Sequence, residues 1–148
     1  FDKSKVAVTK VTEIIAKKLE QVKELLAELS RILDMPIENF QKDLVAIRAA
    51  ERNFQLMVEL ASAINVQILF EHGSKTPDTY KQSFLDLVSM NVLQNDLAKK
   101  LTISAQLRNI LVHEYDFEED YERFYKSAKD FIPAYQEYAR QINSYISK

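Results

Sequence analysis

Arg108, His113 and Tyr115 bring a guanidinium, an imidazole and a phenol together within one or two turns of an expected helix. Cleaving RNA without a metal requires a base for the 2′-hydroxyl proton, a cation for the crowded phosphorane and an acid for the leaving 5′-oxygen. An imidazole titrates at about pH 6.5, and a guanidinium stays charged and can bind two phosphate oxygens. Arg108 and His113 are therefore the candidate catalytic residues.

The spacing limits how these two residues can cooperate. Five residues of straight helix rotate the chain by roughly 140° past a full turn, so Arg108 and His113 would point to different sides. Arg108 and Tyr115, seven residues apart, would lie nearly on one face. A working site therefore needs a helix that bends or ends between Asn109 and His113, or a second subunit, and we favour a two-fold dimer in which two motifs share a cleft.

The residues between Arg108 and His113 are expected to support the site. Ile110, Leu111 and Val112 are apolar and would hold the segment against the rest of the protein. Asn109 is a weak helix former whose amide can reorganise local backbone hydrogen bonds. We predict a structural supporting role for Asn109.

The composition predicts one helical domain over residues 1–148. The chain has 148 residues, 47% of them hydrophobic, which is enough to bury a core without metals or disulfides. A single Gly and three Pro leave little material for hairpin turns and none for a glycine-rich phosphate loop. With no Cys and two His, we expect no cofactor and no metal site, and the absence of Cys is consistent with a reducing cytoplasm.

The charge of the chain argues against a general nucleic-acid binder. The formal net charge is −2, so any contact with RNA must be local. The basic candidates are Lys99, Lys100, Arg48 and Arg52. Carboxylates surround the motif at Glu114, Asp116, Glu118, Glu119, Asp120 and Glu122. These acids either are solvated and favour the start of the last helix, or form a surface that docks a basic partner.

We expect a soluble protein without a membrane span. No uninterrupted apolar run approaches the roughly 20 residues that cross a bilayer, and the charged start leads into an amphipathic stretch rather than a signal peptide. Because the first residue is Phe1, we expect the numbering to begin inside a longer natural chain.

The elements that must position the motif are helices. Apolar residues recur at spacings of three and four, which predicts helices up to residue 33, from 36 to about 72, from 80 to 88, from 93 to the motif, and from 117 to 145. The boundaries rest on Pro36 at a first helical position, Gly73 past a helix end, a loop over residues 74–78, a break at Asn91, and a capping box of Asp116 and Glu119. This pattern predicts an all-α bundle of four main helices plus a short one. Tyr121 to Tyr145 recur at helical spacing and are expected to be structural.

The string Arg108-Asn109-Ile110-Leu111-Val112-His113-Glu114-Tyr115 resembles the Arg, four residues, His, any residue, Tyr signature of HEPN-domain HepT toxins. The order of the other segments resembles that family over most of the chain. The resemblance implies an up-and-down helical bundle that forms a homodimer and acts as a metal-independent endoribonuclease toxin. It also implies a partner, a minimal nucleotidyltransferase (MNT-type) antitoxin that neutralises the toxin by transferring AMP.

Carried over by position, the resemblance makes Arg108 and His113 catalytic and Tyr115 the AMP acceptor. An anionic adenylate on Tyr115 would block the cleft and compete for the phosphate site beside Arg108. Two other hypotheses stay open: a non-catalytic helical module that partners a nucleotidyltransferase, and a purely structural dimerisation bundle.

Overall fold

The computed structural model describes residues 3–113 and 120–148. These residues form helices and no strand, which confirms the predicted all-α fold. The helices are α1 (Lys3–Leu33), α2 (Ile37–Phe40), α3 (Leu44–Glu71), α4 (Tyr80–Ser89), α5 (Asn95–His113) and α6 (Tyr121–Ile146).

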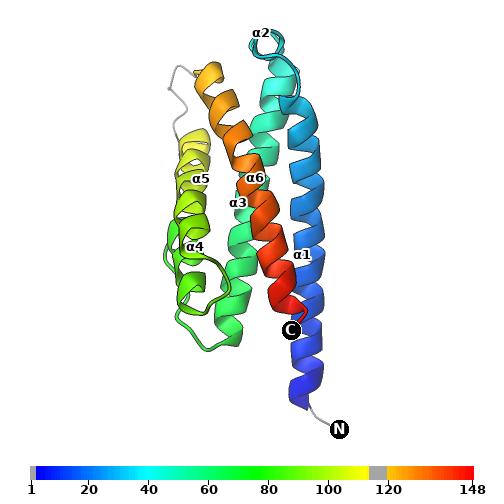
Figure 1. The fold of residues 1–148 in the computed structure, drawn as a ribbon, viewed down its shortest axis with the longest axis vertical. Coiled ribbons are helices and arrows are strands. Elements are labelled where there is room, and N and C mark those ends of the chain that lie inside the picture. Colours follow the sequence, from blue (N-terminus) through cyan, green and yellow to red (C-terminus); the bar gives the residue numbers. More distant parts are fainter. Residues whose placement is uncertain (1–2, 114–119) are drawn as a thin grey trace.

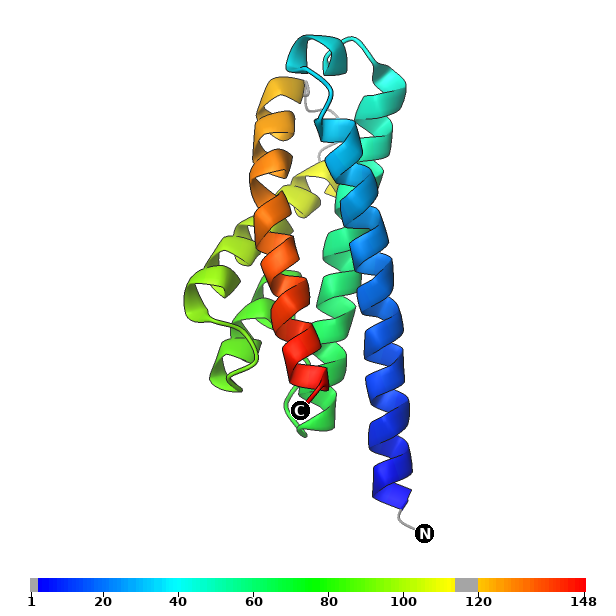
Figure 2. The ribbon, with the colours of Figure 1, turned by 45° about the vertical axis from the view of Figure 1, so that its right-hand side comes forward.

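The long helices α1, α3 and α6 run side by side, and the pair α4 and α5 packs beside them (Figure 1). α1 contacts α3 and α6, whereas α5 contacts α3, α4 and α6. Turning the molecule shows that the first turns of α1 extend beyond the other helices (Figure 2). Since α5 contacts α4 as well as α3 and α6, side chains on its inner face can reach both α4 and the long helices.

The core is one cluster of buried apolar side chains to which every described helix contributes. On α1 the predicted stripe starts at Val11, which is partly buried. It continues with buried side chains at spacings of three and four residues, namely Ile15, Leu19, Val22, Leu26, Leu29 and Leu33. On α6 the tyrosines Tyr125, Tyr135 and Tyr138 are buried, as a structural role requires. Burial of each large apolar side chain contributes about 1.5–3 kcal/mol, so these two stripes hold the bundle together.

The helix predicted from Pro36 to about His72 is wrong, because the chain forms two helices there. Pro36 is the N-cap of α2 and not its first helical residue, and Phe40 anchors α2 in the core. The side chain of Asp43 then accepts a hydrogen bond from the backbone N–H of Ala46 at 3.0 Å and caps α3. An aspartate that caps a new helix in this way competes with continuation of the old one.

The boundaries predicted at Gly73 and Asn91 agree with the described residues. Gly73 has a φ of 69° just past α3, and Asn91 has a φ of 59° just past α4. The predicted capping residues Asp116 and Glu119 lie outside the described residues. Within them, Asp120 is not helical and is the N-cap of α6, which begins at Tyr121, so the start predicted at residue 117 is wrong.

Buried polar contacts tie the helices to one another. The Tyr138 hydroxyl donates to Oδ1 of Asn65 at 2.7 Å, and Nδ2 of Asn65 donates to Oγ of Ser83 at 3.1 Å. Tyr135 and Ser104 share a hydrogen bond of 2.8 Å between their hydroxyl groups. Burial raises the pKa of Tyr135 and of Tyr138, so both phenols stay neutral. These contacts join α6 to α3 and α5, and α3 to α4.

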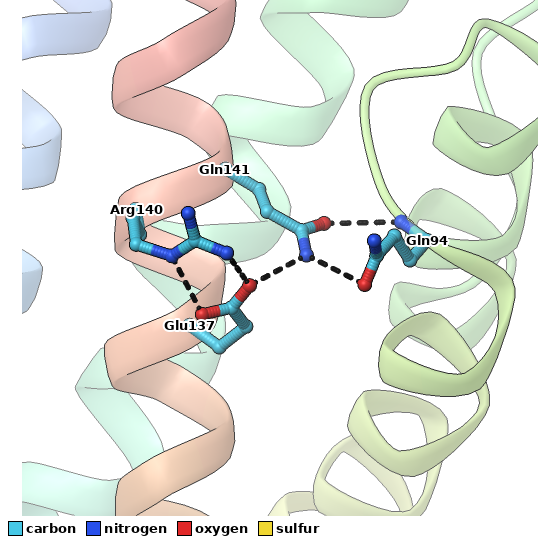
Figure 3. A network of polar contacts seen from close by, with 4 residues as sticks. All are labelled: Gln94, Glu137, Arg140 and Gln141. Carbon is cyan, nitrogen blue, oxygen red and sulfur yellow. Dashed lines mark hydrogen bonds and ion pairs between the residues drawn. The ribbon is translucent and has the colours of Figure 1, made fainter.

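A second polar network fixes the start of α5 against α6 (Figure 3). Oε1 of Gln141 accepts from the backbone N–H of Gln94 at 3.0 Å, and Nε2 of Gln141 donates to Oε1 of Glu137 at 2.9 Å. Arg140 also binds Glu137, and its hydrogen bonds lower the pKa of that carboxyl to about 2. The start of α5 is therefore held at a fixed register along α6.

Among the described residues, α3 is long and apolar enough to cross a membrane by length and composition alone. Half of its most apolar 18-residue window is buried inside the bundle. Buried polar residues of α3, Ser62 and Asn65, are paired with Ser83 of α4. This is the pattern of a core helix in a bundle.

Candidate functional site

Arg108 points into the bundle, where its side chain is only 11% exposed. Its Nη2 donates to Oε1 of Glu59 on α3 at 2.5 Å, and its Nη1 donates to Oδ1 of Asn109 at 3.1 Å. The guanidinium carbon lies 4.5 Å from the ring centroid of Tyr80, the first residue of α4. Three helices therefore build the slot that holds this cation, and the aromatic face adds a cation–π contact.

Glu59 pairs with Nη2 of the Arg108 guanidinium, whereas Nε has no acceptor among the described residues. Burial opposes ionisation of Glu59, but hydrogen bonds from Arg108 and Gln55 outweigh it and hold the pKa of Glu59 below its ordinary value. Glu59 is therefore ionised at neutral pH. Nε of Arg108 is buried and has no hydrogen-bond partner among the described residues. A buried N–H without an acceptor is unfavourable, so this donor remains available for one further hydrogen bond.

His113 is the last residue of α5 and is exposed. α5 continues without interruption through the segment from Asn109 to His113. Arg108 is buried while His113 is exposed, so the two side chains face different surroundings, as their spacing predicts. The helix does not end between Asn109 and His113, and one chain keeps the two functional groups apart.

The outer face of α5 carries His113 together with an exposed stripe. Residues Lys99, Ile103, Gln106 and Ile110 are all exposed and recur at spacings of three and four before His113. Ile103 is 56% exposed and Ile110 is 38% exposed. Large apolar side chains that follow one face of a helix in this way are typical of a contact surface.

Of the other two predicted site residues, the structure describes Asn109 but not Tyr115. Asn109 is exposed and its amide oxygen contacts the guanidinium of Arg108. Tyr115, the predicted AMP acceptor, lies outside the described residues.

The basic residues proposed for RNA contact are not equally close to the motif. α3 and α5 run in opposite directions (Figure 1), and Glu59 meets Arg108 between them. Arg52 lies seven residues before Glu59, and His113 lies five residues after Arg108, so both extend toward the same end of the bundle. Lys100 is about 20 Å back along α5 from His113 and pairs with Asp130 at 3.1 Å.

Arg48, one turn before Arg52, belongs to the same end of the bundle as the motif. Its hydrogen bonds with Glu51 and with Tyr121, the first residue of α6, raise its pKa. The cation is therefore held near the start of α6. Arg48 and Arg52 are better placed than Lys99 and Lys100 to contact an RNA bound at the motif.

Glu59 and Tyr80 are site residues that the sequence analysis missed. Glu59 is the one carboxylate in the apolar segment from Leu56 to Ala61, and a carboxylate in such a segment is usually paired. That signal could have pointed to Glu59 as the partner of a buried cation. Among the described residues, no group of three or more His, Cys, Asp or Glu side chains is arranged to hold a metal ion.

Comparisons with known proteins agree on one family. A family model described as ribonuclease HepT-like matches residues 15–142. The chain is 32% identical over 133 residues to the tRNA nuclease HepT of Aphanizomenon flos-aquae (strain 2012/KM1/D3), covering 90% of each protein.

Solved structures share the fold at lower identity. A tri-AMPylated HEPN toxin of Shewanella oneidensis in complex with an MNT antitoxin superposes with a TM-score of 0.80 at 21% identity, over 88% of this chain and 97% of that one. A cytosolic protein of unknown function from Bacillus subtilis, YutE, superposes with a TM-score of 0.73 at 19% identity, over 89% of this chain and 90% of that one.

Proposed function

The chain belongs to the HepT-like ribonuclease family, and from this membership we propose that it is a metal-independent endoribonuclease toxin that cleaves single-stranded RNA in the cytoplasm. The relative at 32% identity is named a tRNA nuclease, which makes single-stranded parts of tRNA the first substrate to test. The observation that carries the proposal is the placement of Arg108 in a slot with an unused buried donor, on the helix that ends at His113.

The proposed reaction is an attack of the RNA on its own backbone. His113 acts as the base that takes the 2′-hydroxyl proton or as the acid that protonates the leaving oxygen. The 2′-oxygen bonds to phosphorus, the bond from phosphorus to the 5′-oxygen breaks, and that oxygen receives a proton. Arg108 stabilises the charge that develops on the phosphorane. The products are a 2′,3′-cyclic phosphate and a free 5′-hydroxyl.

The proposed active form is a homodimer. An unbroken α5 separates buried Arg108 from exposed His113, so a second copy is needed to bring the two groups to one phosphate.

We also propose a nucleotidyltransferase antitoxin as the partner. Its reaction would join the phenol oxygen of Tyr115 to the α-phosphorus of ATP and release pyrophosphate. The AMP group would add negative charge seven residues after Arg108 and occupy the phosphate site. The likeness to a tri-AMPylated toxin bound to an MNT antitoxin supports this assignment.

The test is RNA cleavage by the purified full chain in the presence of EDTA. We expect wild-type protein to cleave, and Arg108→Ala and His113→Ala each to lose at least 100-fold in rate. Co-production with a nucleotidyltransferase should add one or more AMP masses to the intact protein, and the addition should be absent in Tyr115→Phe. Undiminished cleavage by both alanine variants would contradict the proposal.

The ion pair of Arg108 with Glu59 favours a second candidate function, because it occupies part of the guanidinium. In this alternative the bundle is a non-catalytic module that binds a nucleotidyltransferase. Tight binding of that partner, without RNA cleavage by the partner-free and unmodified protein, would support the alternative.

A further inference from the structure

Arg108 is held by its neighbours before any substrate arrives. A guanidinium has five N–H donors, and here one bond goes to Glu59 and one to Asn109. The guanidinium carbon lies over the ring of Tyr80, 4.5 Å from its centroid. A long side chain with these three contacts cannot rotate freely, so the direction of its remaining donors is fixed by α3 and α4.

The remaining donors include Nε, which is buried without a partner among the described residues. Structural arginines that only complete a core usually have their buried donors paired. At Arg108, by contrast, Nε stays unpaired while the ionised carboxylate of Glu59, whose pKa is lowered, binds Nη2. An anion such as a phosphate oxygen is the natural acceptor for that unpaired donor.

We propose that Glu59 is a positioning residue that orients Arg108 toward the scissile phosphate, with the ring of Tyr80 as the platform on which the guanidinium lies. This inference rests on the proposed ribonuclease function. Glu59 does not contact the RNA in this mechanism. Preorganised donors stabilise a transition state because they need no rearrangement when charge develops, and Glu59 supplies that order.

The kinetic signature separates positioning from binding. In Glu59→Gln the amide keeps the size of the side chain but loses the charge that holds the guanidinium. We expect kcat to fall at least ten-fold while KM stays unchanged or falls, because removal of an anion does not weaken attraction for RNA. Glu137→Gln is the matched control, because it breaks another Arg–Glu pair, on α6. Its kcat should stay within two-fold of wild type.

Two substitutions of Tyr80 test whether its aromatic ring helps to position Arg108. Tyr80→Phe retains the aromatic face, so its kcat should be at least ten-fold higher than that of Tyr80→Leu. Tyr80→Leu loses the face and should lower kcat at least ten-fold. These variants keep the inference testable if Glu59→Gln unfolds at the assay temperature, which a thermal melt of each variant would reveal.

A readout that does not depend on cleavage is the exchange of the Arg108 Nε proton with water, followed by nitrogen-15 NMR and assigned by its loss in Arg108→Lys. We expect slow exchange in wild type and at least ten-fold faster exchange in Glu59→Gln. The same exchange rate in both, or a Glu59→Gln enzyme with unchanged or increased kcat or with only a raised KM, would overturn the role of Glu59. If wild type does not cleave RNA at all, the proposed function fails, whereas the exchange rates still decide whether Glu59 orients Arg108.

Discussion

Glu59 and Arg108 form an ion pair whose members are both largely withdrawn from water, with side chains 28% and 11% exposed. The pair of Arg140 and Glu137 is different, because its side chains are 73% and 35% exposed. Exposed pairs contribute little to stability, since water and salt screen them. A carboxylate removed from beside a buried cation leaves that cation without its partner, which costs more.

At the scale of this residue, the stability difference between wild type and Glu59→Gln should depend on pH. The pKa of Glu59 is lowered in the folded protein, so its contribution is fully present above the ordinary value of 4.5 and is lost as pH falls through the lower folded value. We expect Glu59→Gln to be less stable by about 1–3 kcal/mol at pH 7. The difference should shrink once the pH falls below 4.5.

Urea unfolding of wild type and Glu59→Gln at several pH values measures this difference in the free energy of unfolding. Titratable groups that both proteins share contribute equally and cancel in the difference. A difference that stays constant from pH 7 to well below 4.5 would contradict an ionised Glu59 paired with Arg108.

At the scale of the elements, the spacing of apolar residues predicted the buried faces of the helices. It did not predict the helix boundary at Asp43. The stripe on α1 and the breaks at Gly73 and Asn91 follow from local rules of periodicity and backbone conformation. The division of the helix predicted over residues 36–72 depends on Asp43, which can be a helix interior residue or a cap. The contact of Glu59 with Arg108 spans 49 residues, so only the packing of α3 on α5 creates it.

The buried polar network between α3, α4 and α6 should contribute measurably to the free energy of unfolding. Tyr138→Phe removes the hydroxyl that donates to Asn65 and leaves a buried amide oxygen without that donor. We expect a loss of about 1–3 kcal/mol in the free energy of unfolding, measured in urea. Tyr145→Phe is the matched control on the same helix, because its hydroxyl contacts exposed His72 at 3.3 Å. Equal effects of the two substitutions would show that burial of the network adds nothing.

At the scale of the whole molecule, the two faces of α5 carry different groups. The inner face packs Arg108 against α3 and α4, and the outer face carries Ile103, Ile110 and His113. The sequence predicted this separation from helical rotation alone, but it could not predict that α5 stays unbroken up to His113. Because α5 is unbroken between Arg108 and His113, the proposed site needs a second molecule as long as Arg108 stays paired with Glu59.

Mixing two inactive variants tests the shared site directly. If Arg108 of one subunit works with His113 of the other, a mixed dimer of Arg108→Ala and His113→Ala has one intact site and one doubly damaged site. Random pairing puts half of the subunits in mixed dimers, so an equal mixture should recover about a quarter of wild-type RNA cleavage. Subunits are exchanged by refolding from urea, and dimer formation is followed by sedimentation. Mixed dimers that form but stay inactive would mean that each chain carries its own complete site, which requires Arg108 to leave Glu59 and reach the outer face of α5.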